Sequence, residues 1–116
     1  MRIGTALCIV SLSAGAASAD AQKHDLDGGT MGRGRPASCL VDTPPRERCT
    51  FYPRNGDGSF AIQTSIGRYY ANRAGPDAIQ VDFDNGARMV DQGVFTRSRD
   101  DRACWVRRPD RRICAW

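Results

Sequence analysis

Two pairs of cysteines constrain this chain more than any other feature of its sequence. Nine residues separate Cys39 from Cys49, and nine residues separate Cys104 from Cys114. Each segment has short apolar runs beside its cysteines and a turn that contains proline. In a hairpin, cross-strand neighbours lie within reach of a disulfide. Of the three pairings that four cysteines allow, the spacing favours Cys39–Cys49 and Cys104–Cys114, each directly across a strand pair.

The beginning of the chain has the pattern of a secretory signal peptide over residues 1–21. Arg2 gives the positive start, residues 6–16 are small and apolar, and small residues allow cleavage after residue 19 or 21. The apolar run is too short to cross a bilayer. Export would remove Cys8 and leave four cysteines in an oxidising compartment. We therefore predict a secreted or periplasmic protein whose mature form has no transmembrane segment.

The rest of the chain divides at residue 38. Residues 22–37 are rich in glycine and poor in apolar side chains, so little burial offsets the entropy of ordering them. They are predicted to form a flexible tail, with disorder up to about Pro36. Residues 38–116 have the length of one domain.

Alternation of apolar and polar residues predicts strands throughout that domain, and two turns fix their expected register. A two-residue turn at Asn55-Gly56 would place Phe51 opposite Phe60. A three-residue loop at 84–86, with Gly86 left-handed, would place Phe83 opposite Ala87.

The predicted fold class is all-β, a small disulfide-stapled antiparallel barrel or sandwich of seven or eight short strands. No segment has a helical period, and most strands are joined as hairpins. The expected core is Phe51, Phe60, Ile62, Ile79, Val81, Phe83, Met89, Val94, Phe95, Val106 and Ile113.

Several catalytic chemistries are excluded or disfavoured by the residues present. The single histidine, His24, lies in the predicted tail, so the domain has no histidine-based triad. Paired cysteines leave no thiol nucleophile, and their spacing does not match structural zinc sites. We therefore predict no metal, no cofactor and no catalytic residue. Aspartates lie in or beside turns, where they have a structural reason to be.

Arginine dominates the charge, since Lys23 is the only lysine and the formal net charge is +4. Seven arginines fall between residues 97 and 112. A hairpin over 104–116 would place Trp105 and Trp116 on opposite faces and project guanidinium groups from its turn. The candidate binding residues are Trp105, Arg107, Arg108, Arg111, Arg112 and Trp116.

The function that these features favour is a small, exported, non-enzymatic binding or inhibitor-like module, predicted to be a monomer, whose partner is an extracytoplasmic protein or an anionic polymer. One alternative is a basic domain that binds an anionic cell-surface polymer, and another is a small aspartate-dependent hydrolase. Nucleic acid is disfavoured because the net charge is mild. An arginine-aromatic face would favour the polymer, an exposed apolar patch the protein partner, and a cleft with two aspartates the hydrolase.

Overall fold

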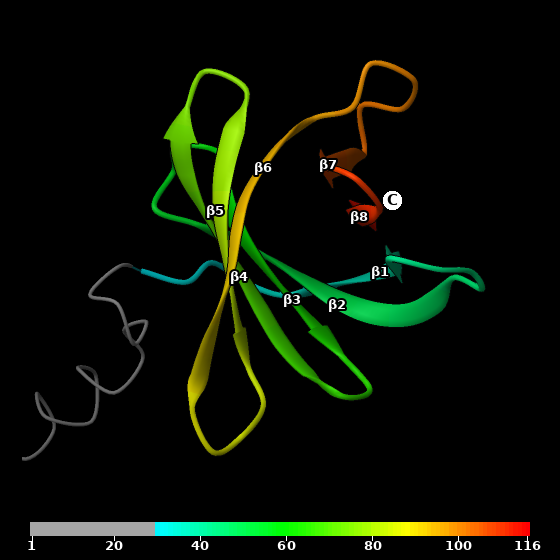
Figure 1. Cartoon of the computed structure of the whole chain (residues 1–116). Helices are drawn as coiled ribbons and strands as arrows, with labels where there is room; N and C mark the ends of the chain where they lie inside the picture. Colours follow the sequence, from blue (N-terminus) through cyan, green and yellow to red (C-terminus); the bar gives the residue numbers. More distant parts are fainter. Residues whose placement is uncertain (1–29) are drawn as a thin grey trace, which may run out of the picture. The chain divides into compact units, whose positions relative to one another are not determined.

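The domain is a closed barrel of eight antiparallel strands, which the computed structural model describes over residues 30–116 (Figure 1). The predicted signal peptide 1–21 and the tail up to residue 29 lie outside the described residues. The prediction of an all-β, disulfide-stapled antiparallel fold is confirmed, and the barrel is the form it takes. Its strands are β1 (Arg35–Val41), β2 (Glu47–Arg54), β3 (Ser59–Thr64), β4 (Gly67–Gly75), β5 (Ala78–Asp84), β6 (Met89–Arg97), β7 (Cys104–Arg107) and β8 (Arg111–Ala115). β1 therefore begins three residues before the predicted domain start at residue 38.

Each strand pairs with its neighbours in the chain, and the last strand pairs with the first. β8 meets β1 through Cys39 opposite Ala115 and Val41 opposite Ile113. Trp116 extends this seam, because its amide donates to the Ser38 carbonyl at 2.9 Å and its carbonyl accepts from the Ser38 amide at 3.2 Å. Closure gives each of the eight described strands a neighbour on both sides, although β6 pairs with β7 only through Thr96 and Arg97, and it reduces the length of free sheet edge that could template aggregation.

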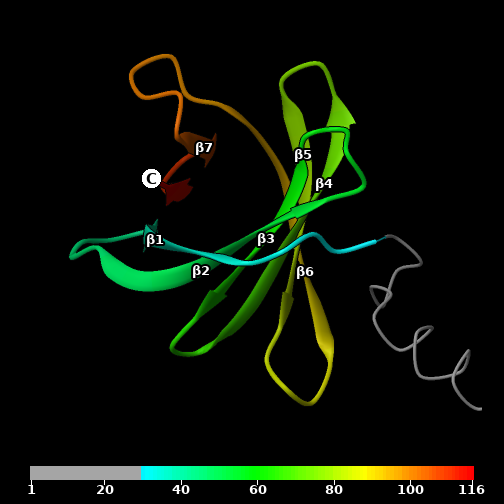
Figure 2. The ribbon, with the colours of Figure 1, turned by 180° about the vertical axis from the view of Figure 1, so that it is seen from behind.

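Connections in such a barrel alternate between its two ends. The β1–β2, β3–β4, β5–β6 and β7–β8 turns form one end, named here the β1–β2 end. The β2–β3, β4–β5 and β6–β7 connections form the other, the β6–β7 end. Figure 1 shows the β4–β5 turn and the β6–β7 loop at the top, with the β3–β4 and β5–β6 turns at the bottom, and Figure 2 shows the same arrangement from behind.

Inward-facing side chains fill the barrel. Most of the expected core is buried there, although Phe51 and Phe83 are only half-buried, and Val106 was predicted wrongly because it alternates with the inward-facing Trp105 and lies on the outer wall. At the β6–β7 end, Phe60 stacks on Phe51 with 5.3 Å between ring centroids and lies 6.4 Å from Trp105. The buried cluster inside the barrel is Cys39, Cys49, Phe60, Ile62, Tyr69, Ala71, Ile79, Val81, Phe95, Trp105 and Ile113.

Both predicted disulfides are present, on different sides of the wall. Cys39–Cys49 lies inside the barrel, whereas Cys104–Cys114 packs with Leu40 in a second buried cluster on the outside. Cys104 and Cys114 are directly opposed, as predicted. Cys39 is not opposed to Cys49, because Cys49 pairs with Ala37 and the bridge runs diagonally over a Cα–Cα distance of 5.8 Å. The bridges are consistent with an oxidising, extracytoplasmic location.

The first predicted hairpin has the right faces and the wrong register. Phe51 pairs with Ile62 and not with Phe60, because the connection is a four-residue loop from Asn55 to Gly58. Asp57 stabilises that loop by accepting a hydrogen bond from the Ser59 amide at 2.9 Å. A shift of two residues keeps each side chain on its predicted face.

The second hairpin was predicted wrongly. Its loop also has four residues, so Phe83 pairs with Val90 in place of Ala87. Gly93 does not interrupt the strand: with a φ of 91° it completes a β-bulge in β6 that leaves Gln92 unpaired. Met89 and Val94 are 42% and 48% exposed, so they do not belong to the core.

Candidate functional site

The two tryptophans of the terminal hairpin lie on opposite faces, as predicted. Trp105 is buried in the barrel with the Arg97 guanidinium 4.0 Å from its ring centroid. Trp116 lies outside, where its Nε1 donates to the Asp101 carboxylate at 3.1 Å and Arg46 stacks on its ring at 3.6 Å. They therefore do not form one aromatic platform.

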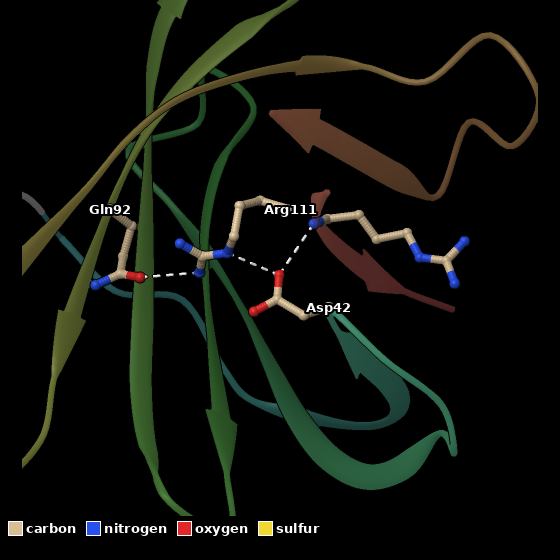
Figure 3. A network of polar contacts seen from close by, with 4 residues as sticks. Asp42, Gln92 and Arg111 are labelled. Carbon is tan, nitrogen blue, oxygen red and sulfur yellow. Dashed lines mark hydrogen bonds and ion pairs between the residues drawn. The ribbon is translucent and has the colours of Figure 1, made fainter. Parts of the chain in front are cut away.

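Arg111 has a structural role that its sequence position did not indicate (Figure 3). Its Nε donates to Asp42 Oδ1 and its Nη2 to Gln92 Oε1, each at 2.9 Å. Asp42 Oδ1 also accepts the Arg112 amide at 3.1 Å. These contacts join the β1–β2 loop, the β6 bulge and β8. Arg111 is thus not among the projecting guanidinium groups that the sequence led us to expect.

Arg107 and Arg108 are both exposed, although the Arg107 side chain lies against Gly93 of the β6 bulge, and both line a groove with Arg97 and Arg99. We name Arg97, Arg99, Arg102, Arg107 and Arg108 together the arginine surface. It lines a groove of about 570 Å³ on the outer wall, a recess of about 720 Å³ beside the loop, and a barrel mouth of about 230 Å³. Two apolar side chains, Val94 and Val106, also line the groove. Among residues 30–116, the carboxylates that line these hollows are Asp77 and Asp100, so positive charge dominates there.

Arg97 lines all three hollows and is the centre of the arginine surface. Its Nη1 donates to the Arg102 carbonyl at 2.7 Å. Its Nε is buried without a hydrogen-bond acceptor among the described residues, although it forms an ion pair with Asp77 Oδ1 at 4.0 Å. A buried donor without an acceptor is uncommon, because it carries a desolvation cost of about 1–3 kcal/mol.

The aspartates in turns do the structural work that their positions predicted. Asp57, Asp84 and Asp101 each accept a hydrogen bond from the backbone amide two residues ahead. The Ser59 hydrogen bonds lower the pKa of Asp57. Asp91, which accepts from Gln80 and from the Gly93 amide, has its pKa lowered in the same way. These carboxylates already have partners within the fold.

The structure distributes the six candidate binding residues over several places. Arg107 and Arg108 share the groove, Trp105 lies in the barrel mouth, Arg111 is in the Asp42 network, and Trp116 is on another part of the wall. Arg112 is exposed next to Val106. Sequence reasoning missed Arg97, Arg99 and Arg102, although the charge cluster between residues 97 and 112 was a usable signal.

Comparison of the chain with protein-family models, with curated proteins and with solved structures finds no match. Residues 30–116 include no helix long and apolar enough to cross a membrane. In the same part of the chain, His, Cys, Asp and Glu side chains form no group of three or more that could hold a metal ion.

Proposed function

We propose that this protein is an exported, non-enzymatic binding domain whose ligand is an anionic polymer of the cell surface, held on the arginine surface. The observation that carries the proposal is Arg97, which lines three arginine-rich hollows and has a buried Nε with no hydrogen-bond acceptor among residues 30–116. An oxyanion of the ligand would supply that acceptor. Arginine suits this role because its planar fork matches carboxylate, sulfate and phosphate groups.

The surroundings of Arg97 support a polymer in preference to a single small anion. The hollows are open and continue over the outer wall, where Arg107 and Arg108 form no ion pair within residues 30–116. Val94 and Val106 in the groove would contact the uncharged parts of a repeating unit. A protein partner has less support, because the large exposed apolar side chains Ile66, Met89, Val94 and Trp116 lie on different turns and strands.

The test replaces Arg107 and Arg108 together by glutamine and measures retention on a heparin column across a salt gradient. Loss of two phosphate-like or sulfate-like contacts should lower the salt concentration of elution and flatten the dependence of binding on salt. The matched control replaces Arg48 and Arg88, which are exposed elsewhere, and removes the same charge. Equal losses in the two double variants would show that only net charge matters and would reject the site.

Arg97→Lys tests the central donor more narrowly. Lysine keeps the positive charge and removes the fork, so retention should fall at unchanged net charge. The thermal midpoint of the variant, measured in parallel, separates loss of the ligand contact from loss of the stacking on Trp105. Unchanged retention by a folded Arg97→Lys variant would contradict the proposed role of Nε.

Export itself is part of the proposal and has its own measurement. The signal pattern over residues 1–21 and the two bridges support a secreted or periplasmic protein. N-terminal sequencing of the protein from cell fractions should give a start at Asp20 or Gln22 in the extracytoplasmic fraction. An uncleaved chain that stays in the cytoplasm would contradict it.

A further inference from the structure

A half-enclosed pocket of about 180 Å³ lies at the β1–β2 end, and its lining differs from the arginine surface. The β1–β2 loop, the first residue of β2, the β3–β4 turn and β4 all contribute to it. Its apolar lining includes Val41, Pro45 and Ile66. Ile66 is 68% exposed at the tip of its turn, where no core position requires an isoleucine.

Tyr69 lines this pocket with a hydroxyl that has no partner within the described chain. The residue is only 6% exposed, and its ring packs on Phe83 with 4.5 Å between centroids. Burial raises the pKa of the Tyr69 phenol, and the charges of Asp42 and Glu47 raise it further while Arg111 lowers it. Asp42 and Glu47 line the same pocket as Tyr69. Tyr69 is mostly buried but lines the pocket, so a ligand there would provide a hydrogen-bond partner for its hydroxyl.

The charged groups around the pocket leave an excess of negative charge. Asp42 uses Oδ1 for the Arg111 and Arg112 contacts, and its Oδ2 accepts no hydrogen bond from residues 30–116. Glu47 accepts the Ser65 amide at 3.0 Å and the Ser65 hydroxyl. Two carboxylates thus face one guanidinium.

The arginines next to Glu47 in the chain do not offset this charge. The Arg46 guanidinium lies over the ring of Trp116, and Arg48 lines a separate hollow on the outside of β1 and β2. Neither of these two arginines lines the pocket that contains Tyr69.

We propose that this pocket binds a primary alkylammonium group with a short apolar stem. The ammonium would donate to Asp42 Oδ2, Glu47 and the Tyr69 hydroxyl, and the stem would contact Val41 and Ile66. Since one water occupies about 30 Å³ of liquid, the pocket has room for about six non-hydrogen atoms. That is the size of pentylamine, or of a lysine side chain together with its Cα.

The test titrates the oxidised protein with pentylammonium at neutral pH and follows backbone amide resonances by NMR. Saturable shifts are expected for residues 41–47 and 64–69, with a dissociation constant on the order of 1 mM for so small a ligand. Pentanol, with the same stem and no charge, should bind at least about fivefold more weakly, as expected for loss of about 1 kcal/mol of charge-assisted hydrogen bonding. Equal binding of pentanol, or shifts outside these segments, would overturn the proposal.

Variants locate the contacts. Glu47→Gln and Tyr69→Phe should each weaken pentylammonium binding several-fold. Tyr69→Phe keeps the ring in the core and removes only the unpartnered hydroxyl, so the fold should be retained. Asp82→Asn, which removes a carboxylate outside the pocket, is the control and should bind as the wild type does. If Glu47→Gln and Tyr69→Phe bind pentylammonium no more weakly than Asp82→Asn does, the cation is held by diffuse charge and the proposed site does not exist.

Two further ligands distinguish the source of the cation. Nα-acetyl-lysine amide binding at least as tightly as pentylammonium would assign the pocket to a lysine of a partner protein. Binding of pentylammonium alone would assign it to a free small amine. In both cases Nα-acetyl-norleucine amide, which lacks the ammonium, should not bind.

Discussion

Arg111 shows that neighbouring residues of one type can have different roles in this molecule. Arg111 points into the β1–β2 end, where it joins Asp42, Gln92 and the ring of Phe95, whose centroid is 5.8 Å from the guanidinium. Arg112, the next residue, points outward and is exposed. The alternation of a strand explains the difference, since successive side chains face opposite sides of the wall.

This contrast gives a prediction for a matched pair of variants. Arg111→Gln should lower the free energy of unfolding by about 1 kcal/mol, because it removes two charge-assisted hydrogen bonds that are partly screened by solvent. Arg112→Gln removes the same charge and should change stability by less than about 0.5 kcal/mol. Urea denaturation at neutral pH measures both. Similar effects of the two substitutions would mean that net charge, and not the Asp42 network, is responsible.

At the scale of the elements, the length of each turn determined whether the strand register predicted from the sequence was right. The period of two identified the inward faces of β2, β3 and β5, because burial on one side is a property of the strand itself. Registers were wrong where the loop length was wrong, since the Asn55-Gly56 and Asn85-Gly86 dipeptides also occur in four-residue loops. The bulge at Gln92 could not be read from the sequence.

Two glycines with positive φ give the second prediction. Gly86 has a φ of 96° and open space around it, so Gly86→Ala should cost only backbone strain, about 1 kcal/mol. Gly67 has a φ of 150°, and an added Cβ would lie 2.5 Å from the Asp84 carbonyl oxygen. Gly67→Ala should therefore cost at least about 3 kcal/mol or prevent folding. Thermal denaturation of the oxidised proteins compares them, and equal costs would contradict the close approach of β4 and β5.

The two disulfides allow a comparison at fixed loop length, which is the third prediction. Both bridges span ten positions, so the chain-entropy contribution is the same for each, about 2–3 kcal/mol. Alanine in place of Cys39 and Cys49 also leaves a cavity inside the barrel, whereas the Cys104–Cys114 cluster lies on the outer wall and can relax. The first double variant should therefore lose about 1 kcal/mol more than the second in urea denaturation. The reverse order would show that the outer cluster, and not the interior bridge, is the more tightly packed.

For the whole molecule, the sequence predicted the class of fold better than the site. Two cysteine pairs, alternating strands and turn residues all indicated the same all-β fold, and such agreement between levels makes a prediction robust. The arginine surface depends on long-range placement instead, because the barrel brings the β6–β7 loop beside Arg107 and Arg108. Arg54, which is 1% exposed and bonded to Asn72 at 2.7 Å, likewise had no signal in the sequence.

The charge composition of the barrel is unusual and sets its response to pH. Residues 30–116 contain fifteen arginines and ten aspartates and glutamates, hence a net charge of +5, and no lysine or histidine. Histidine and free cysteine are the side chains whose ordinary pKa values lie between those of the carboxylates and that of tyrosine. Residues 30–116 contain no histidine, and their four cysteines are disulfide-bonded and do not titrate. Dependence of stability on pH should come from the acid and alkaline extremes.

The last prediction is the shape of that dependence. Asp57 and Asp91 have pKa values below the ordinary value, so their contribution is complete above the unfolded pKa and is lost as pH falls through the lower folded pKa. Tyr69 has a raised pKa, so the folded state retains its proton more strongly, and stability should fall as pH rises from about 10 through the folded pKa. Urea midpoints from pH 2 to 11 should show a plateau that declines at both ends. Salt should restore part of the acid loss, because protonated carboxylates leave the arginines to repel one another. Tyr69→Phe should flatten the alkaline decline alone, and an unchanged decline in that variant would place its cause in other groups.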